Sequence, residues 1–520
     1  MREIKGLGAR FFGHSDLAEE PASFTPKHLI PLLLLLVSTS VAHATLKPEH
    51  VVVVVNESSV ASRTVAKAYV RARGIPPENT ISLNDVPAGL KVSLEDFQAK
   101  ILMPVLKEIE SKGLASRTRV IAYSAGFPTS VNVSKHHQRL DDDQLKKYQK
   151  PTASITGLTY LYQFLLADSA NYLGFGSNLY ARGSFERHFV NPFMRGPEKD
   201  AFDAAMSSLN DGDDQQAAES FEELLRQHPR MSPIAVRAAE CRSRLGETAA
   251  AERLVRQAIL SGWSSARYLR ESDSLESISR LDRLKSLVDR LDDYPTSMQG
   301  PIEFSSRFGW ANNGHPHARS DRGVRYMMSC MLAVVHERGS NIEEAIDGLE
   351  RSSKSDESNP KGKFWFTVTK DIRTKTRFPA VGNAIEWLRH LQHDADLVHA
   401  VMPSQESDCV GLMLGTPSMP LGSRSWTFVP GAISENLTSL SAAFGTKSQS
   451  KITELLHAGA ALSGGAVAEP YSIPNKFPSP MLYGYYATGL SGIEAFYLSI
   501  TSSYQYLIVG DPLVRPFSKR

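Results

Sequence analysis

The chain has 520 residues, of which 42% are hydrophobic and 22% are charged, and its formal net charge is +2. This length exceeds what one hydrophobic core usually supports, so we expect more than one folded unit. No basic stripe with interleaved aromatic residues is present, so the sequence predicts no nucleic-acid partner. Cys241, Cys330 and Cys409 are widely separated, which argues against a disulfide framework or a thiolate zinc site.

Residues 1–44 are predicted to be a secretory signal peptide. A basic stretch is followed by an apolar run over 29–37 and then by Ala42, His43 and Ala44, which form an A-x-A cleavage site. The apolar run is shorter than the ~18 residues that a membrane-spanning helix needs. We therefore expect cleavage near Ala44 and an extracytoplasmic location, periplasmic or secreted. If the segment is retained, it would serve as an anchor, which is the one membrane contact that the sequence predicts.

Residues 45–196 are predicted to be the first part of an α/β domain. Five consecutive valines over 51–55 indicate a strand buried on both faces of a parallel sheet. A helix follows and stops at Gly74, a second short strand lies near Leu83, another helix covers 94–112, and a third strand covers 119–128. Strands that alternate with helices in this way predict a mostly parallel sheet flanked by helices.

Residues 293–520 are predicted to be the second part of the same domain, because the alternation returns there. Apolar runs predict strands at "KFWFTVTKD", "ADLVHAVM", "CVGLMLG", "SWTFVPG", "GGAVAEP" and "YQYLIVGDP", with helices over 380–393, 447–459 and 490–500. Cys330 lies in "YMMSCMLAVV", which has the character of an apolar helix, and we expect it to be a core residue.

Residues 197–292 are predicted to be a helical insertion with an internal repeat. Two segments align with a constant offset of 34 residues, which pairs Gly212 with Gly246 and Ala217 with Ala251, and likewise Phe221 with Val255 and Leu225 with Ile259. This is the period of tetratricopeptide repeats, which the insertion resembles. A generic helical hairpin is the alternative, and both interpretations predict contact with a protein partner.

Several charged residues follow predicted strands, where ligands bind in open α/β sheets. Asp371 and Arg373 follow the strand "KFWFT", Glu435 follows "TFVPGAIS", Glu469 follows "GGAVA", and Asp511 follows "YLIVG". Glu435, Glu469 and Asp511 are therefore weak candidates for catalytic carboxylates. The alternative for the Gly-Asp-Pro tripeptide at Asp511 is purely structural, since its residues suit a tight turn.

A proline-rich loop after Glu469 carries Lys476, and its prolines hold the loop in one course. We expect Lys476 and Glu469 to converge with Asp371, Arg373 and Asp511 on one binding cleft. No complete Cys/His or Ser/His/Asp constellation is visible, so a catalytic set is unknown. The sequence predicts neither a metal site nor a cofactor.

The α/β parts resemble an uncharacterised family of bacterial envelope proteins that occurs in species carrying exosortase. The resemblance rests on segments that include "GKFWFTVTKDIRTKTRFP", "VGLMLGTPS", "FVPGAISENLTS" and the block from "LLHAGAALSGGAVAEPYSIPNKFP" to "YQYLIVGDPLVRPF". The final block is also similar to gingipain-type cysteine peptidases, which implies a caspase-like fold. Those peptidases carry a histidine and a cysteine after successive strands, whereas this chain has Glu435-Asn436 and Thr488-Gly489 in the corresponding regions.

Three functions are therefore open at this point. The first is an extracytoplasmic protein that binds a protein or peptide partner in an exosortase-associated envelope. The second is a hydrolase, peptidase-like or directed at a glycan, that uses the strand-end carboxylates. The third is an assembly scaffold in which the tetratricopeptide-like insertion is the functional surface.

Overall fold

The computed structural model describes residues 46–181, 197–229, 231–260, 266–282, 284–285, 288, 303–312, 314–317, 323–404 and 408–518. The predicted signal peptide and its cleavage site near Ala44 lie outside these residues. Among the described residues, no helix combines the length and the apolar character needed to cross a membrane.

One ten-stranded sheet contains strands from both sides of the predicted insertion, residues 197–292, which is called the helical segment below. Its strands are β1 Val51–Asn56, β2 Thr80–Leu83, β4 Val120–Tyr123, β9 Met328–Met331, β10 Lys363–Thr367, β11 Asp394–Val398, β12 Cys409–Leu414, β13 Phe428–Asn436, β14 Leu462–Ala466 and β15 Tyr506–Gly510. Their order across the sheet is β11-β10-β12-β13-β14-β15-β9-β4-β1-β2. The prediction of a mostly parallel α/β sheet flanked by helices is confirmed.

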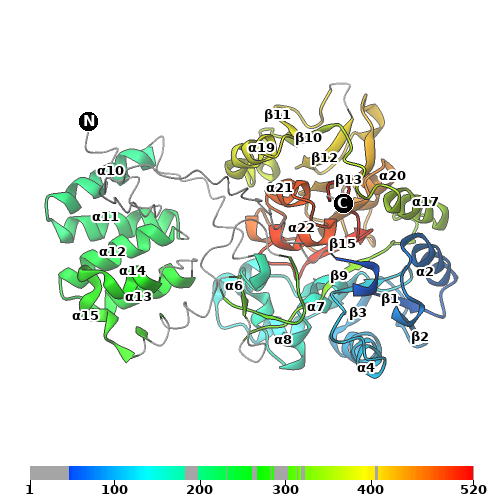
Figure 1. The fold of residues 1–520 in the computed structure, drawn as a ribbon, viewed down its shortest axis with the longest axis horizontal. Helices are drawn as coiled ribbons and strands as arrows, with labels where there is room; N and C mark the ends of the chain where they lie inside the picture. The colour runs from blue at the N-terminus through cyan, green and yellow to red at the C-terminus, as the bar shows by residue number, and fades with distance from the viewer. Residues whose placement is uncertain are drawn as a thin grey trace, which may run out of the picture. The chain divides into compact units, whose positions relative to one another are not determined.

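The sheet consists of two strand sets that run in opposite directions. The first strand set, β2-β1-β4-β9-β15, is parallel throughout. The second strand set, β11-β10-β12-β13-β14, is also parallel throughout. The sets meet where β14 and β15 pair antiparallel, and Figure 1 shows β13 and β9 on opposite sides of β15. Each set has the order 2-1-3-4-5 in its own numbering, which is the order of flavodoxin-like sheets.

The opposed directions of the two sets decide where functional groups can meet. In a parallel sheet, ligands bind beyond the carboxyl ends of the strands. Because the two sets are antiparallel to each other, their carboxyl ends lie at opposite edges of the sheet. The molecule therefore has two such edges rather than one.

Local sequence explains the elements that carry the sheet. The side chains of Val51 to Val54 are fully buried, as expected for a strand covered on both faces. Helix α2 (Val60–Arg73) begins at Ser59, whose side chain accepts a hydrogen bond from the backbone N–H of Ser62. It ends at Gly74, whose φ of 62° favours glycine.

Helices and two small sheets complete the α/β part. Its longer helical elements are α3 Leu94–Asp96 continued by a π-helix Phe97–Leu102 and α4 Met103–Ser111, then α6 Asp143–Tyr148, α7 Ile155–Tyr160, α8 Tyr162–Leu166, α17 Ile342–Ser353, α19 Val381–His390, α20 Ile452–His457, α21 Leu482–Ala487 and α22 Gly492–Ser499. The small sheets are β3 Lys91–Ser93, β5 Ser130–Asn132 and β6 Thr152–Ser154, and β7 Gly309–Trp310 with β8 Pro316–His317. Helices α2 and α17 pack against each other, as Figure 1 shows.

The helical character predicted around Cys330 is wrong. Cys330 lies in β9, which pairs with β4 in the centre of the sheet. Its side chain is fully buried, so the expectation that it is a core residue is confirmed. Burial raises the pKa of its thiol well above the usual value, which makes it a poor nucleophile.

The helical segment has a hydrophobic core of its own. Its helices are α10 Pro197–Asn210, α11 Asp214–Gln227, α12 Ser232–Arg244, α13 Thr248–Leu260, α14 Ala266–Glu271 and α15 Glu276–Ser279. Helices α11, α12 and α13 lie side by side in sequence order (Figure 1).

The 34-residue offset relates equivalent positions in this segment. Gly212 and Gly246 end the turns before α11 and α13, with φ of 80° and 77°. Ala217 and Ala251 are both fully buried on those helices, where their small side chains let neighbouring helices approach closely. Helices α11 and α13 thus begin 34 residues apart, at Asp214 and Thr248. The side chain of Ile259, which the alignment pairs with Leu225, lies outside the described residues.

Candidate functional site

The predicted site residues are divided between the two edges of the sheet. Asp371 and Glu469 follow β10 and β14, and Glu435 lies near the end of β13, so all three are at the carboxyl edge of the second strand set. Asp511 follows β15, whose last residue, Gly510, pairs with the first residue of β14. The prediction that Asp511 shares one cleft with the others is wrong, because β15 is antiparallel to β14.

The Asp511 carboxylate is buried and fully engaged by protein groups. It accepts hydrogen bonds from the Tyr69 hydroxyl at 3.0 Å, from Ser352 Oγ at 2.7 Å and from Arg73 Nε at 2.8 Å. It also accepts the backbone N–H of Leu513 at 3.0 Å, which closes the Gly-Asp-Pro turn. Through these bonds the carboxylate joins α2, α17 and the segment after β15.

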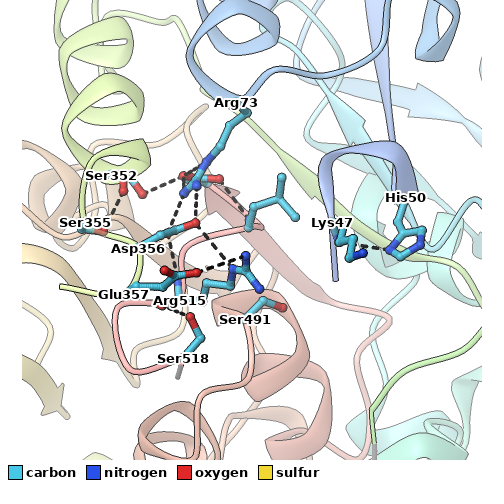
Figure 2. A network of polar contacts seen from close by, with 12 residues as sticks. Lys47, His50, Arg73, Ser352, Ser355, Asp356, Glu357, Ser491, Arg515 and Ser518 are labelled. Carbon is cyan, nitrogen blue, oxygen red and sulfur yellow. Dashed lines mark hydrogen bonds and ion pairs between the residues drawn. The ribbon is translucent and has the colours of Figure 1, made fainter. Parts of the chain in front are cut away.

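Arg73 extends this network to a second carboxylate. Its Nη1 atom lies 2.6 Å from Asp356 Oδ2, and Asp356 Oδ1 accepts the backbone N–H of Arg515 at 3.1 Å. Figure 2 shows Arg73, Ser352, Asp356 and Arg515 gathered in this way. Burial raises the pKa of Asp356, and the neighbouring guanidinium of Arg73 opposes that effect. These residues form a buried network of ion pairs and hydrogen bonds, which favours the structural interpretation of the Gly-Asp-Pro tripeptide.

Glu435 is held in a second buried ion pair. Its Oε2 atom pairs with Arg377, and its Oε1 atom accepts a hydrogen bond from the Tyr506 hydroxyl at 3.1 Å. Arg377 also donates to the backbone carbonyl oxygen of Leu414. Burial raises the pKa of Glu435, while the positive charge of Arg377 opposes that rise. Both oxygens of this carboxylate are thus occupied within the protein.

Asp371 and Arg373 lie at the point of the second strand set where the strand order reverses, between β10 and β12. Asp371 Oδ1 accepts the backbone N–H of Arg373 at 2.9 Å and so caps the short helix α18 (Ile372–Lys375). The same carboxylate pairs with the Arg373 guanidinium at 3.1 Å. A Cβ atom added to Gly415, just after β12, would lie 2.7 Å from the backbone carbon of Arg373. The segments that follow β10 and β12 therefore pack tightly against each other at this point.

The corresponding point of the first strand set, between β1 and β4, is also bridged by the chain. Asn56 Nδ2 donates to the carbonyl oxygen of Gly126 at 2.7 Å, across the ends of the two strands. A Cβ atom on Gly126 would lie 2.5 Å from the side-chain oxygen of Ser59. Each of the two places where flavodoxin-like sheets bind ligands is thus narrowed by internal contacts.

Lys476 is the most perturbed of the predicted site residues. Its side chain is buried, with 1% of its surface exposed, and its Nζ atom donates to the carbonyl oxygen of Tyr148 at 2.6 Å and to Gln505 Oε1 at 2.9 Å. Burial, aided by the nearby charge of Lys150 and opposed by Glu469, lowers its pKa from an ordinary 10.5 to about 7.

Glu469 does not bond directly to Lys476. Its Oε1 atom accepts the backbone N–H of Tyr471 at 2.7 Å, and the Tyr471 hydroxyl accepts a hydrogen bond from Lys150 Nζ at 2.7 Å. Tyr471 has a φ of 58°, which is unusual for a residue other than glycine. Glu469 and Lys476 are thus brought to one region of the molecule, and a strongly shifted lysine pKa is typical of functional sites.

Sequence reasoning missed the arginines and the glutamine of these networks. Arg377 lies in the same basic run as Arg373, so composition marked the segment without identifying the residue. No sequence pattern connects Arg73 with Asp511, because the strand order alone brings them together. Among the described residues, no group of three or more His, Cys, Asp or Glu side chains is arranged to hold a metal ion.

Comparison of the chain with protein-family models, with curated proteins and with solved structures gave no match.

Proposed function

We propose that this chain is an extracytoplasmic protein that binds a protein or peptide partner, with the helical segment as the binding surface. Two observations support this: the segment has its own core, and its helices α11 and α13 begin 34 residues apart. Tetratricopeptide-type repeats stack in this way and bind extended partners along their surface. The resemblance of the α/β part to an exosortase-associated family supports an envelope setting for such binding.

The observation that carries this proposal is a hollow of about 460 Å³ on the helical segment. Leu225 and Leu254 line it together with the charged side chains of Glu222, Arg226 and Arg253. Apolar residues surrounded by charged ones suit a peptide that buries one side chain and pairs at its rim. The hollow is formed by α11 and α13, the equivalent helices of the two repeats.

A caspase-like arrangement of the α/β part is included in the proposal. The second strand set followed by an antiparallel β15 suits the resemblance of the closing block to gingipain-type peptidases. Fold carries over between such proteins more readily than chemistry.

The hydrolase alternative has less support than binding. Glu435 and Asp511 each use both carboxylate oxygens in bonds to buried protein groups, and they lie at opposite edges of the sheet. A pair of carboxylates that acts on one bond must face a common substrate. A pure scaffold, the third function, would use the same helical surface and differs only in the number of partners.

Site-specific photo-crosslinking in the native envelope tests the proposal. A photoreactive phenylalanine analogue replaces Arg253, which is exposed at the hollow, and in a control chain it replaces Lys67, which is exposed on α2. We expect a discrete crosslinked protein with the Arg253 variant and none with the Lys67 variant. Crosslinks that form from Lys67 alone, or from neither position, contradict binding at the helical segment.

A further inference from the structure

A second hollow, on the α/β part, lies between α20 and the loop that follows β12. Its volume is about 310 Å³, at the lower end of the range for small-molecule pockets. It is lined by Met419, Leu421, Gly422, Arg424, Glu454, His457 and Ala458. Met419 and Leu421 are almost fully buried, so the hollow has an apolar floor with charged groups around it.

Arg424 has hydrogen-bonding capacity that the described protein does not use. Its Nη1 atom donates to the carbonyl oxygen of Leu421 at 2.6 Å, within the same turn. Its Nε atom is buried and has no hydrogen-bond acceptor among the described residues. Its Nη2 atom also makes no hydrogen bond with a described residue and, unlike Nε, is not shielded from solvent, so Nη2 is the donor that a ligand in the hollow can reach.

Arg424 also forms no ion pair with a described residue, although Glu454 lines the same hollow. Glu454 Oε1 accepts the backbone N–H of Lys451 at 2.7 Å, which leaves its Oε2 atom for another donor. His457 is turned towards α17 and the residues before it, since its Nε2 atom lies 3.0 Å from Ser340 Oγ and 3.3 Å from Glu344 Oε2 in α17. The hollow thus offers one guanidinium and one carboxylate that are not paired with each other.

We infer that this hollow binds the carboxylate of a peptide C-terminus or of an N-acylated amino acid with an apolar side chain. Arg424 takes the carboxylate, because a guanidinium matches its two oxygens with parallel N–H groups. Met419 and Leu421 receive the apolar side chain, and Glu454 accepts the amide N–H that such a ligand carries. The site lies on the α/β part and is independent of the partner surface proposed for the helical segment.

The experiment is a titration of the chain with N-acetyl-leucine, followed by ligand-observed NMR. N-acetyl-leucinamide, which lacks the carboxylate, is the matched ligand. We expect saturable binding of the acid and at least about tenfold weaker binding of the amide, since a charge-assisted bond contributes an order of magnitude or more in affinity.

Three variants locate the site. Arg424→Gln removes the guanidinium and should weaken binding of the acid by about tenfold or more. Gly422→Leu adds an apolar side chain to a residue that lines the hollow, at a position where a Cβ atom meets no other atom within 4 Å. The control is Arg389→Gln, since Arg389 is exposed, pairs with Asp396 and lies outside the hollow.

The outcomes separate clearly. Loss of binding in both Arg424→Gln and Gly422→Leu, with retention in Arg389→Gln, supports the site. If Arg424→Gln does not fold, Gly422→Leu alone decides. The inference is overturned if the chain does not bind the acid at millimolar concentration, if acid and amide bind equally, or if Gly422→Leu binds as the unaltered chain does. None of these results affects the crosslinking test of the helical segment.

Discussion

Replacement of Lys476 by methionine should remove a specific pH dependence from the stability of the protein. Lys476 is buried, and its pKa falls from an ordinary value of 10.5 to about 7 in the folded chain. Between those two values the unfolded chain binds more protons than the folded chain, so stability rises with pH. The penalty for burying the charge is fully present below pH 7 and is relieved as the pH approaches 10.5.

The size of the effect follows from the two pKa values. Each pH unit between them changes the free energy of unfolding by up to about 1.4 kcal/mol. From pH 7 to pH 9 the contribution is about 2 kcal/mol, because Lys476 is half protonated at the start of the range. Methionine has a similar length to lysine but no charge. Lys476→Met also loses the hydrogen bonds to Tyr148 and Gln505, and this loss does not vary with pH.

Urea unfolding at pH 7, 8 and 9 measures this difference. The unaltered chain should gain stability relative to Lys476→Met by about 2 kcal/mol across the range. Lys135→Met is the control, because the Lys135 side chain is 72% exposed and should leave the pH dependence unchanged. A constant difference between Lys476→Met and the unaltered chain at all three pH values would refute the reasoning.

Three further predictions concern buried contacts. Asp511→Ala should lower the free energy of unfolding by about 3–5 kcal/mol, because it leaves Arg73 without its closest buried partner. Urea unfolding measures this loss, and a loss below about 1 kcal/mol would contradict a stabilising role for the Asp511 network. Arg377→Met should destabilise the protein more than the double variant Arg377→Met/Glu435→Leu, because only the single variant leaves an unpaired buried charge. Thermal unfolding ranks the two, and the reverse order would count against a buried pair. Ala251→Leu should lower the free energy of unfolding by about 1–3 kcal/mol, because the fully buried alanine lies where helices pack closely. Unfolding followed by the helical signal measures this loss, and an unchanged stability would indicate a loosely packed hairpin instead.

The sequence predicted the strands because most of them are short apolar runs bounded by turn residues. It failed at β9, since "MSCM" lacks β-branched residues and continues into a longer apolar run. It also placed Asp511 in one cleft with the other predicted site residues, which requires β15 to run parallel to β10 and β14, and strand direction has no signature in the strand itself. The antiparallel β15 therefore separated Asp511 from the other predicted site residues.

The candidate site shows the same limit at the level of single side chains. Lys476 was named from its loop, but its burial was not foreseen, because lysines are rarely buried. Arg424 gave no signal, since an arginine in a loop is normally solvated, and only the shape of the surrounding chain leaves its Nε atom without an acceptor. The ion pairs of Glu435 and Asp511 join segments far apart in sequence, and a single sequence does not show such pairs.

The position of β15 has a consequence for how the chain folds. This strand lies between β9 and β14, and it is the last strand in sequence order. Until residues 506–510 have been synthesised, β9 and β14 both present open edges, because the first strand set lacks its fifth strand and the second strand set lacks the neighbour of β14. The ten-stranded sheet therefore cannot be completed before the last strand is made, and truncations before β15 should yield aggregation-prone products rather than a smaller stable domain.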